Sequence, residues 1–69
     1  MERNELRAKL VLMGKRNIDV ILEMKKNGFS VSQEQFSRAF SETATEPKQQ
    51  LIRSEAERIV TAWENAQRA

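Results

Sequence analysis

The sequence predicts an all-α, compact domain built from four helices. Apolar residues recur at intervals of three and four along most of the chain, which is the spacing of one helix face. The two Gly and the single Pro fall between these segments, where helices end and begin. The length of 69 residues leaves room for one domain, 1–69.

The first predicted helix runs from Asn4 to Met13. Asn4 is a favourable N-cap residue. The apolar face of this helix is expected to contain Leu6, Leu10, Val11 and Met13. Gly14 follows at once and suits the left-handed conformation that ends many helices.

The second predicted helix runs from Asn17 to Lys26. Asn17 is the expected N-cap, and Asp19 places a negative charge in the first turn, where the helix dipole favours it. Its apolar residues are Ile18, Val20, Ile21, Leu22 and Met24. Asn27-Gly28 ends the helix, and Phe29-Ser30-Val31 is then expected to be a short extended piece with both apolar side chains inward.

The third predicted helix is short, from Gln33 to Phe40. Ser32 precedes it, and Gln35 stands three residues later, which is the spacing of a capping box. Its apolar stripe consists of Phe36, Ala39 and Phe40, and Val31 is expected to pack onto Phe36.

The fourth predicted helix is the longest, from Pro47 to about Gln67, and follows a loop over residues 41–46. Pro47 suits a first helical turn, with Thr45 as the expected N-cap. The apolar stripe consists of Ile52, Ala56, Ile59 and Trp63, widened by Leu51 and Val60. A helix of this length extends roughly 30 Å, so residues 47–69 are also the expected dimer contact.

The composition excludes several classes of site. The chain has no Cys, no His and no Tyr. A disulfide framework, a zinc site of the usual ligands and a Ser–His–Asp triad are therefore ruled out. The ten Asp and Glu are interleaved with Lys and Arg, as on solvated helix faces. We expect no enzyme activity and no cofactor, and a small domain stabilised by helix packing, oligomerisation or both.

No stretch approaches the roughly 20 apolar residues that span a bilayer. The N-terminal residues Met1-Glu2-Arg3-Asn4-Glu5 are charged and contain no apolar signal core. We therefore expect a cytoplasmic protein with no membrane contact.

A helix, a Gly-containing turn and a short polar-faced helix form the pattern of a helix-turn-helix. The run Val31–Phe40 resembles the recognition helix of the lambda-repressor-like (XRE-type) family, and Gly14–Val20 resembles the opening of its first motif helix. The resemblance covers about Leu6 to Val60. The sequence departs from the family in a longer turn, in Ile21 at a position of a small residue, and in the absence of a Gly after the third helix and of a fifth helix.

The resemblance implies a DNA interface centred on a recognition helix at about 32–40, which Ser32 opens. It assigns Gln33 and Gln35 to base edges, where a glutamine amide can bond bidentately to adenine. The remaining DNA contacts fall into two groups. Glu34 would accept from cytosine N4 or repel phosphate, and the phosphate contacts are Lys15, Arg16, Asn17, Ser37, Arg38 and Lys48.

Some of these residues also have a structural interpretation, in which Gln33 and Gln35 are ordinary exposed residues of a short helix. Gln35 can be used in the capping box, and Arg38 can pair with Glu34 at i, i+4 on a solvated face. The aromatic residues are expected to lie in the core, Trp63 least securely, with a dimer contact as its alternative.

The net charge of +2 is unevenly spread. Residues 1–28 hold seven basic and four acidic side chains (+3), residues 29–48 hold two and three (−1), and residues 49–69 hold three of each. Three functions remain open, and the third, after the two described next, is a structural dimerisation module that binds neither DNA nor a host protein. The first is a phage- or mobile-element-encoded repressor-like transcriptional regulator that binds operator DNA as a homodimer. The second is a protein-binding module, an antirepressor or an inhibitor of a host protein, which the low charge and Glu34 favour.

Overall fold

The computed structural model describes residues 1–41 and 46–68, and within these ranges the chain is all-α. The four helices are α1 (Arg3–Leu12), α2 (Asn17–Lys26), α3 (Gln33–Ala39) and α4 (Pro47–Arg68). The prediction of four helices is confirmed, and each predicted boundary lies within one residue of the observed one. None of the described helices is long and apolar enough to span a bilayer.

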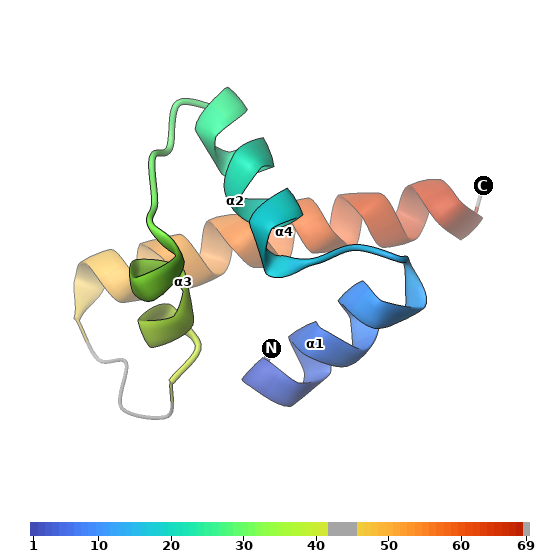
Figure 1. Cartoon of the computed structure of the whole chain (residues 1–69), viewed down its shortest axis with the longest axis horizontal. Helices are drawn as coiled ribbons and strands as arrows, with labels where there is room; N and C mark the ends of the chain where they lie inside the picture. Colours follow the sequence, from blue (N-terminus) through green and yellow to red (C-terminus); the bar gives the residue numbers. More distant parts are fainter. Residues whose placement is uncertain (42–45, 69) are drawn as a thin grey trace.

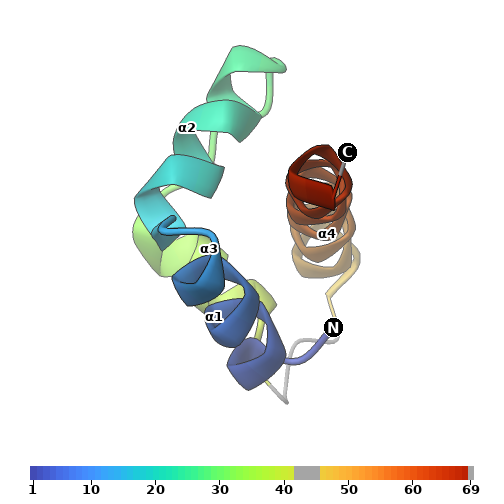
Figure 2. The same ribbon diagram turned by 90° about the vertical axis from the view of Figure 1, so that its right-hand side faces the viewer.

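The longest helix, α4, is the base on which the other three pack (Figure 1). Its 22 residues rise about 33 Å, close to the 35 Å long axis of the chain. The view turned by 90° shows α1, α2 and α3 along one flank of α4 (Figure 2). None of the described helices covers the other flank of α4 (Figure 2).

One hydrophobic core lies between α4 and the three shorter helices. It consists of Leu6, Leu10, Val20, Ile21, Met24, Val31, Phe36, Ala39, Phe40, Ile52, Ala56, Ile59 and Val60. The predicted apolar positions are thus mostly confirmed, and Phe29 and Trp63 pack against this core while partly buried. Four predicted members differ, because the exposed fractions are 68% for Val11, 38% for Ile18, 50% for Leu22 and 56% for Leu51. Each lies at the edge of its helix's apolar face, outside the width that the neighbouring helices cover.

The two glycines end α1 and α2 with the same hydrogen-bond pattern. Gly14 has φ +69° and Gly28 has φ +84°, a left-handed conformation that suits glycine. The Lys15 N–H donates to the Leu10 carbonyl at 2.8 Å, and the Phe29 N–H donates to the Met24 carbonyl at 2.8 Å. These are the long bonds of Schellman motifs, so both predicted helix ends are confirmed.

At the N-termini of the helices, two of the predicted N-cap residues are wrong and the predicted capping box is confirmed. Asn4 lies inside α1, whose cap position is Glu2, and Asn17 is the first residue of α2, whose cap position is Arg16. The Asp19 carboxylate accepts from the Arg16 backbone N–H at 2.8 Å, so an acid three residues onward caps this end. The capping box of α3 is present as predicted. Thr45 lies outside the described residues.

Candidate nucleic-acid interface

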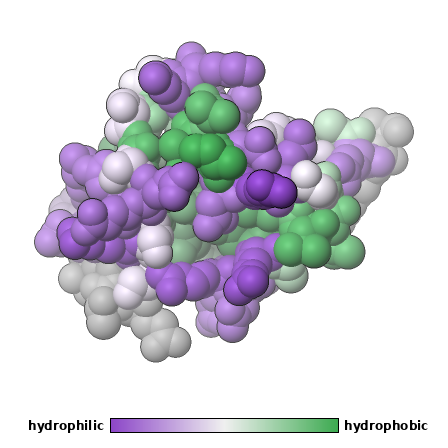
Figure 3. Space-filling model, in the orientation of Figure 1, coloured by the Kyte–Doolittle hydropathy of each residue, from purple (hydrophilic) through white to green (hydrophobic). Residues whose placement is uncertain are grey.

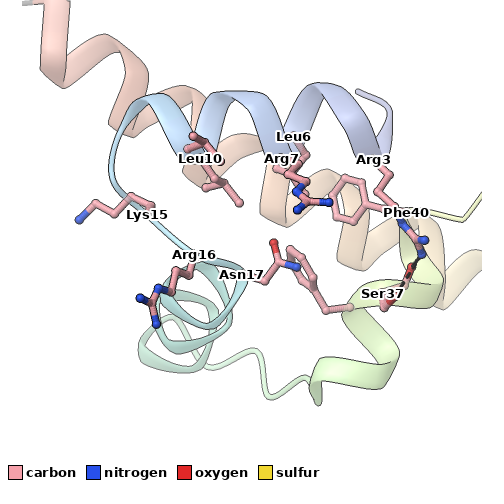
Figure 4. Close-up of a pocket in the computed structure, with 11 residues that line it drawn as sticks. Arg3, Leu6, Arg7, Leu10, Lys15, Arg16, Asn17, Ser37 and Phe40 are labelled. Atoms are coloured by element: carbon pink, nitrogen blue, oxygen red, sulfur yellow. Dashed lines mark hydrogen bonds between the residues drawn. The ribbon is translucent and has the colours of Figure 1, made fainter.

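A groove of about 460 Å³ lies between α1, the N-terminus of α2 and α3 (Figure 4). We call it the α1–α3 groove, and its lining residues are Arg3, Leu6, Arg7, Leu10, Val11, Lys15, Arg16, Asn17, Phe36, Ser37 and Phe40. Among these lining residues, which belong to the described part of the chain, four are cationic and none is acidic. Such a surface has a positive potential and attracts anions.

The floor of the α1–α3 groove is part of the hydrophobic core. Leu6, Leu10, Phe36 and Phe40 are each at most 4% exposed. The rings of Phe36 and Phe40 lie 5.2 Å apart between centroids and are tilted by 46°. Because the floor is packed in this way, the positions of the cations around it are set by the folding of α1, α2 and α3.

Arg3 joins α1 to α3 at one end of this groove. Its Nη2 donates to the Ser37 carbonyl at 2.8 Å and to the Ser37 hydroxyl at 3.1 Å. The contact places a positive charge at the C-terminal end of α3, where the helix dipole favours it. Ser37, a predicted phosphate contact, therefore already accepts a hydrogen bond within the chain.

The other three cations are arranged around Asn17. Arg7 and Asn17 extend toward each other from α1 and α2, whereas Lys15 and Arg16 point away from the groove (Figure 4). The Lys15 ammonium lies 5.1 Å from the centroid of the Trp63 ring. Within the described ranges, the guanidinium groups of Arg7 and Arg16 have no hydrogen-bond or ion-pair partner, and both residues are exposed. These two cations are free to meet a phosphate.

Two predicted site residues at the start of α3 bond to each other. The Ser32 hydroxyl accepts from the Gln35 N–H at 3.1 Å, and the Gln35 Oε1 accepts from the Ser32 N–H at 3.0 Å. A bidentate contact with adenine uses both the oxygen and the nitrogen of the amide. Since its oxygen is already engaged, Gln35 caps α3 in this structure.

The solvent side of α3 carries the remaining predicted residues of the recognition helix. Arg38 Nη2 lies 2.6 Å from Glu34 Oε1, with both side chains exposed, as the structural interpretation predicted. Gln33 is exposed in the first turn of α3. Gln33 is therefore the amide on this helix that remains able to contact a base edge.

The α1–α3 groove contains four of the site residues predicted from the sequence and two cations that were not predicted. Lys15, Arg16, Asn17 and Ser37 line it, whereas Lys48 lies exposed in the first turn of α4 and does not. Arg3 and Arg7 were not selected. Their i, i+4 spacing and the +3 charge of residues 1–28 were the available signals, but the facing helix is some 30 residues away in the sequence.

Comparison with known proteins gives no relative. No family model matches the chain, and neither a curated protein nor a solved structure matches it.

Proposed function

We propose that this chain binds duplex DNA, with α3 as the helix that enters the major groove. The observation that carries the proposal is the α1–α3 groove, whose described lining has four cations and no acid and which lies beside the exposed face of α3. The major groove of B-DNA is about 12 Å wide and admits one helix. Arg7, Arg16 and Lys15 would then meet the phosphates that flank it.

The roles of the residues follow from which side chains are free. Gln33 is exposed in the first turn of α3, the part of a recognition helix that contacts base edges. Asn17 is the first residue of α2 and faces the groove, where its amide and the helix N-terminus suit a phosphate oxygen. The resemblance to lambda-repressor-like proteins gives the same two assignments.

One α3 helix of seven residues reads few base pairs. Regulators of this kind therefore bind as dimers to two half-sites about one helical turn apart. We accordingly propose a transcriptional regulator that acts as a homodimer on operator DNA.

The test is the salt dependence of DNA binding, measured by fluorescence anisotropy. Each neutralised phosphate contributes about 0.9 to the slope of log K against log salt concentration. Arg7→Gln with Arg16→Gln should lower this slope by roughly two. The matched control is Arg58→Gln, because Arg58 is an exposed arginine of α4 that does not line the α1–α3 groove.

The proposal requires the double variant and the control to differ. Circular dichroism should show the same helical signal for both, because all three arginines are exposed. An equal change of slope in both variants, or no binding of the unaltered chain to any duplex at low salt, would contradict a DNA interface in this groove.

A protein-binding module is the second candidate function. It is favoured by the Glu34–Arg38 ion pair, which leaves the exposed side of α3 without net charge. In that case α3 would contact an antirepression target or a host enzyme rather than DNA. Co-purification of one protein, abolished by Gln33→Arg, together with absence of DNA binding at low salt, would support this function over the first.

A further inference from the structure

The exposed hydrophobic side chains of the described residues are concentrated at the corner between α1 and α2. Of the five large ones, Leu51 lies on α4, and the other four are Val11 (68% exposed), Leu12 (86%), Ile18 (38%) and Leu22 (50%). The space-filling view shows one hydrophobic area over α2 and another over the C-terminal end of α1 (Figure 3). Clusters of this kind on a small domain mark a contact surface.

A second groove, of about 540 Å³, opens beside this corner. We call it the α2–α4 groove, and it is lined by Lys15, Asp19, Leu22, Glu23, Lys25, Lys26 and Trp63. Leu22 forms its wall on α2 and Trp63 its wall on α4. Ile18 lies one helical turn before Leu22 and extends the apolar row along α2.

Charges of both signs surround the apolar walls of the α2–α4 groove. Lys15, Lys25 and Lys26 face Asp19 and Glu23, so the described lining carries three basic and two acidic side chains. The Lys26 ammonium lies 3.8 Å from a Glu23 carboxylate oxygen, with the lysine 77% exposed. A two-fold interface needs a patch that is complementary to itself, and a patch with both signs meets that need. A strongly acidic or strongly basic partner would meet like charges here.

The outward flank of α4 lacks these properties. The apolar stripe of α4 is buried within the chain at Ile52, Ala56, Ile59 and Val60. Its exposed positions include Ser54, Arg58, Thr61 and Asn65, with Leu51 as the large apolar side chain among them. Since interfaces have an apolar centre and a polar rim, this flank is the poorer surface for a second copy.

We infer that a second copy of this chain docks on the α2–α4 groove about a two-fold axis, with Leu22 and Trp63 at the centre. A stable interface covers about 800 Å² on each partner, roughly a sixth of the 4964 Å² surface of this chain. Ile18 and Leu22 on α2, with Trp63 on α4, supply the apolar part of this surface, and the charged residues of the groove surround it. Lys15 is the one lining residue shared with the α1–α3 groove, so the dimer leaves α3 uncovered.

The first test compares two leucines of similar exposure by sedimentation equilibrium. Leu22→Glu should raise the dimer dissociation constant about thirtyfold, the factor of a central interface side chain. Leu51→Glu is the matched control and should leave the constant unchanged. A chain that is monomeric at every concentration, or a dimer that only Leu51→Glu disrupts, would overturn the inference.

The second test uses charge and keeps the inference falsifiable if Leu22→Glu fails to fold. One variant carries Glu23→Lys, which leaves the groove with one acid among its charges, and the other carries Lys25→Glu with Lys26→Glu, which leaves it with one base. Each variant alone should be monomeric, because like charges face each other. An equimolar mixture should form a heterodimer, whereas two stable homodimers would contradict a two-fold contact here.

These tests are independent of DNA. A monomeric chain that still binds duplex DNA refutes the inferred dimer and leaves the proposed function intact. A dimer that depends on Leu22 and binds no DNA refutes the function and leaves the inference intact.

Discussion

The α1–α3 groove and the α2–α4 groove share Lys15 and differ in every other respect. Among the described lining residues, the first has cations without acids above a floor of buried side chains, and the second has charges of both signs beside an exposed Leu22 and a partly buried Trp63. Under the two proposals, attraction of DNA to the first would be electrostatic and would fall with salt, whereas association of two copies through the second would depend on apolar contact and would change little with salt. The two proposals thus assign DNA and a second copy of the chain to separate surfaces of one small domain.

The largest difference between the grooves is in folding stability. Phe36, on the floor of the α1–α3 groove, is 2% exposed, and Phe36→Ala should cost about 3–5 kcal/mol. The whole stability of a 69-residue chain is roughly 3–10 kcal/mol, so this variant is expected to be largely unfolded. Leu22→Ala, on the wall of the other groove, should cost well under 1 kcal/mol in the monomer. Urea unfolding followed by circular dichroism measures both, and equal losses would contradict the distinction.

Gly28 connects α2, which lines both grooves, to α3. Its φ of +84° is strained for any residue with a Cβ, and no atom lies within 4 Å of where that Cβ would be. Gly28→Ala should therefore cost about 1–2 kcal/mol through backbone strain alone. Urea unfolding of this variant should show the loss without a change in the slope of free energy against urea. No loss would mean that the Schellman end of α2 is not maintained in solution.

Substitutions of Arg3 test whether its side chain holds α1 and α3 together at the α1–α3 groove. Removal of its two hydrogen bonds to Ser37 in Arg3→Ala should cost about 1 kcal/mol. Arg3→Lys keeps the charge but not the planar donor geometry, and should recover only part of this loss. Full recovery by lysine would show that charge, rather than hydrogen bonding, joins α1 to α3.

The smallest expected effect concerns the outward flank of α4, outside both grooves. The hydrogen bond from Arg58 holds the pKa of Glu55 below its ordinary value. Because the pKa of Glu55 is lowered in the folded chain, its ionised carboxylate stabilises the fold at pH values above the ordinary pKa of glutamate. This stabilisation is lost as the pH falls through the lowered pKa. Arg58→Gln should return the pKa of Glu55 to its ordinary range in an NMR titration. An unchanged titration would show that the two side chains do not pair in solution.

The helices were predictable because their signals are local. Ser32 and Gln35 satisfy each other over three residues, and Gly28 supplies a backbone conformation that other residues avoid. The predicted cap at Asn4 lies two residues from the observed cap position, Glu2, and the one at Asn17 lies one residue from Arg16, where the Asp19 carboxylate accepts from the backbone N–H.

The grooves were not predictable, because they depend on how helices cross. The approach of Arg3 to Ser37 joins residues 34 positions apart, and no spacing in the sequence encodes it. The exposure of Val11 and Leu51 has the same origin, since both lie at the edge of a helix face whose covered width is set by the neighbouring helices.

Selection of bound sites from random duplex DNA tests the central proposal most directly. The unaltered chain should enrich an inverted repeat whose half-sites lie about one helical turn apart. Gln33→Ala should relax the preference at one base pair of each half-site by about 1–3 kcal/mol, whereas Gln50→Ala, an exposed glutamine on α4, should not. No enrichment of any sequence at low salt, or a preference that Gln33→Ala leaves intact, would contradict recognition of DNA by α3.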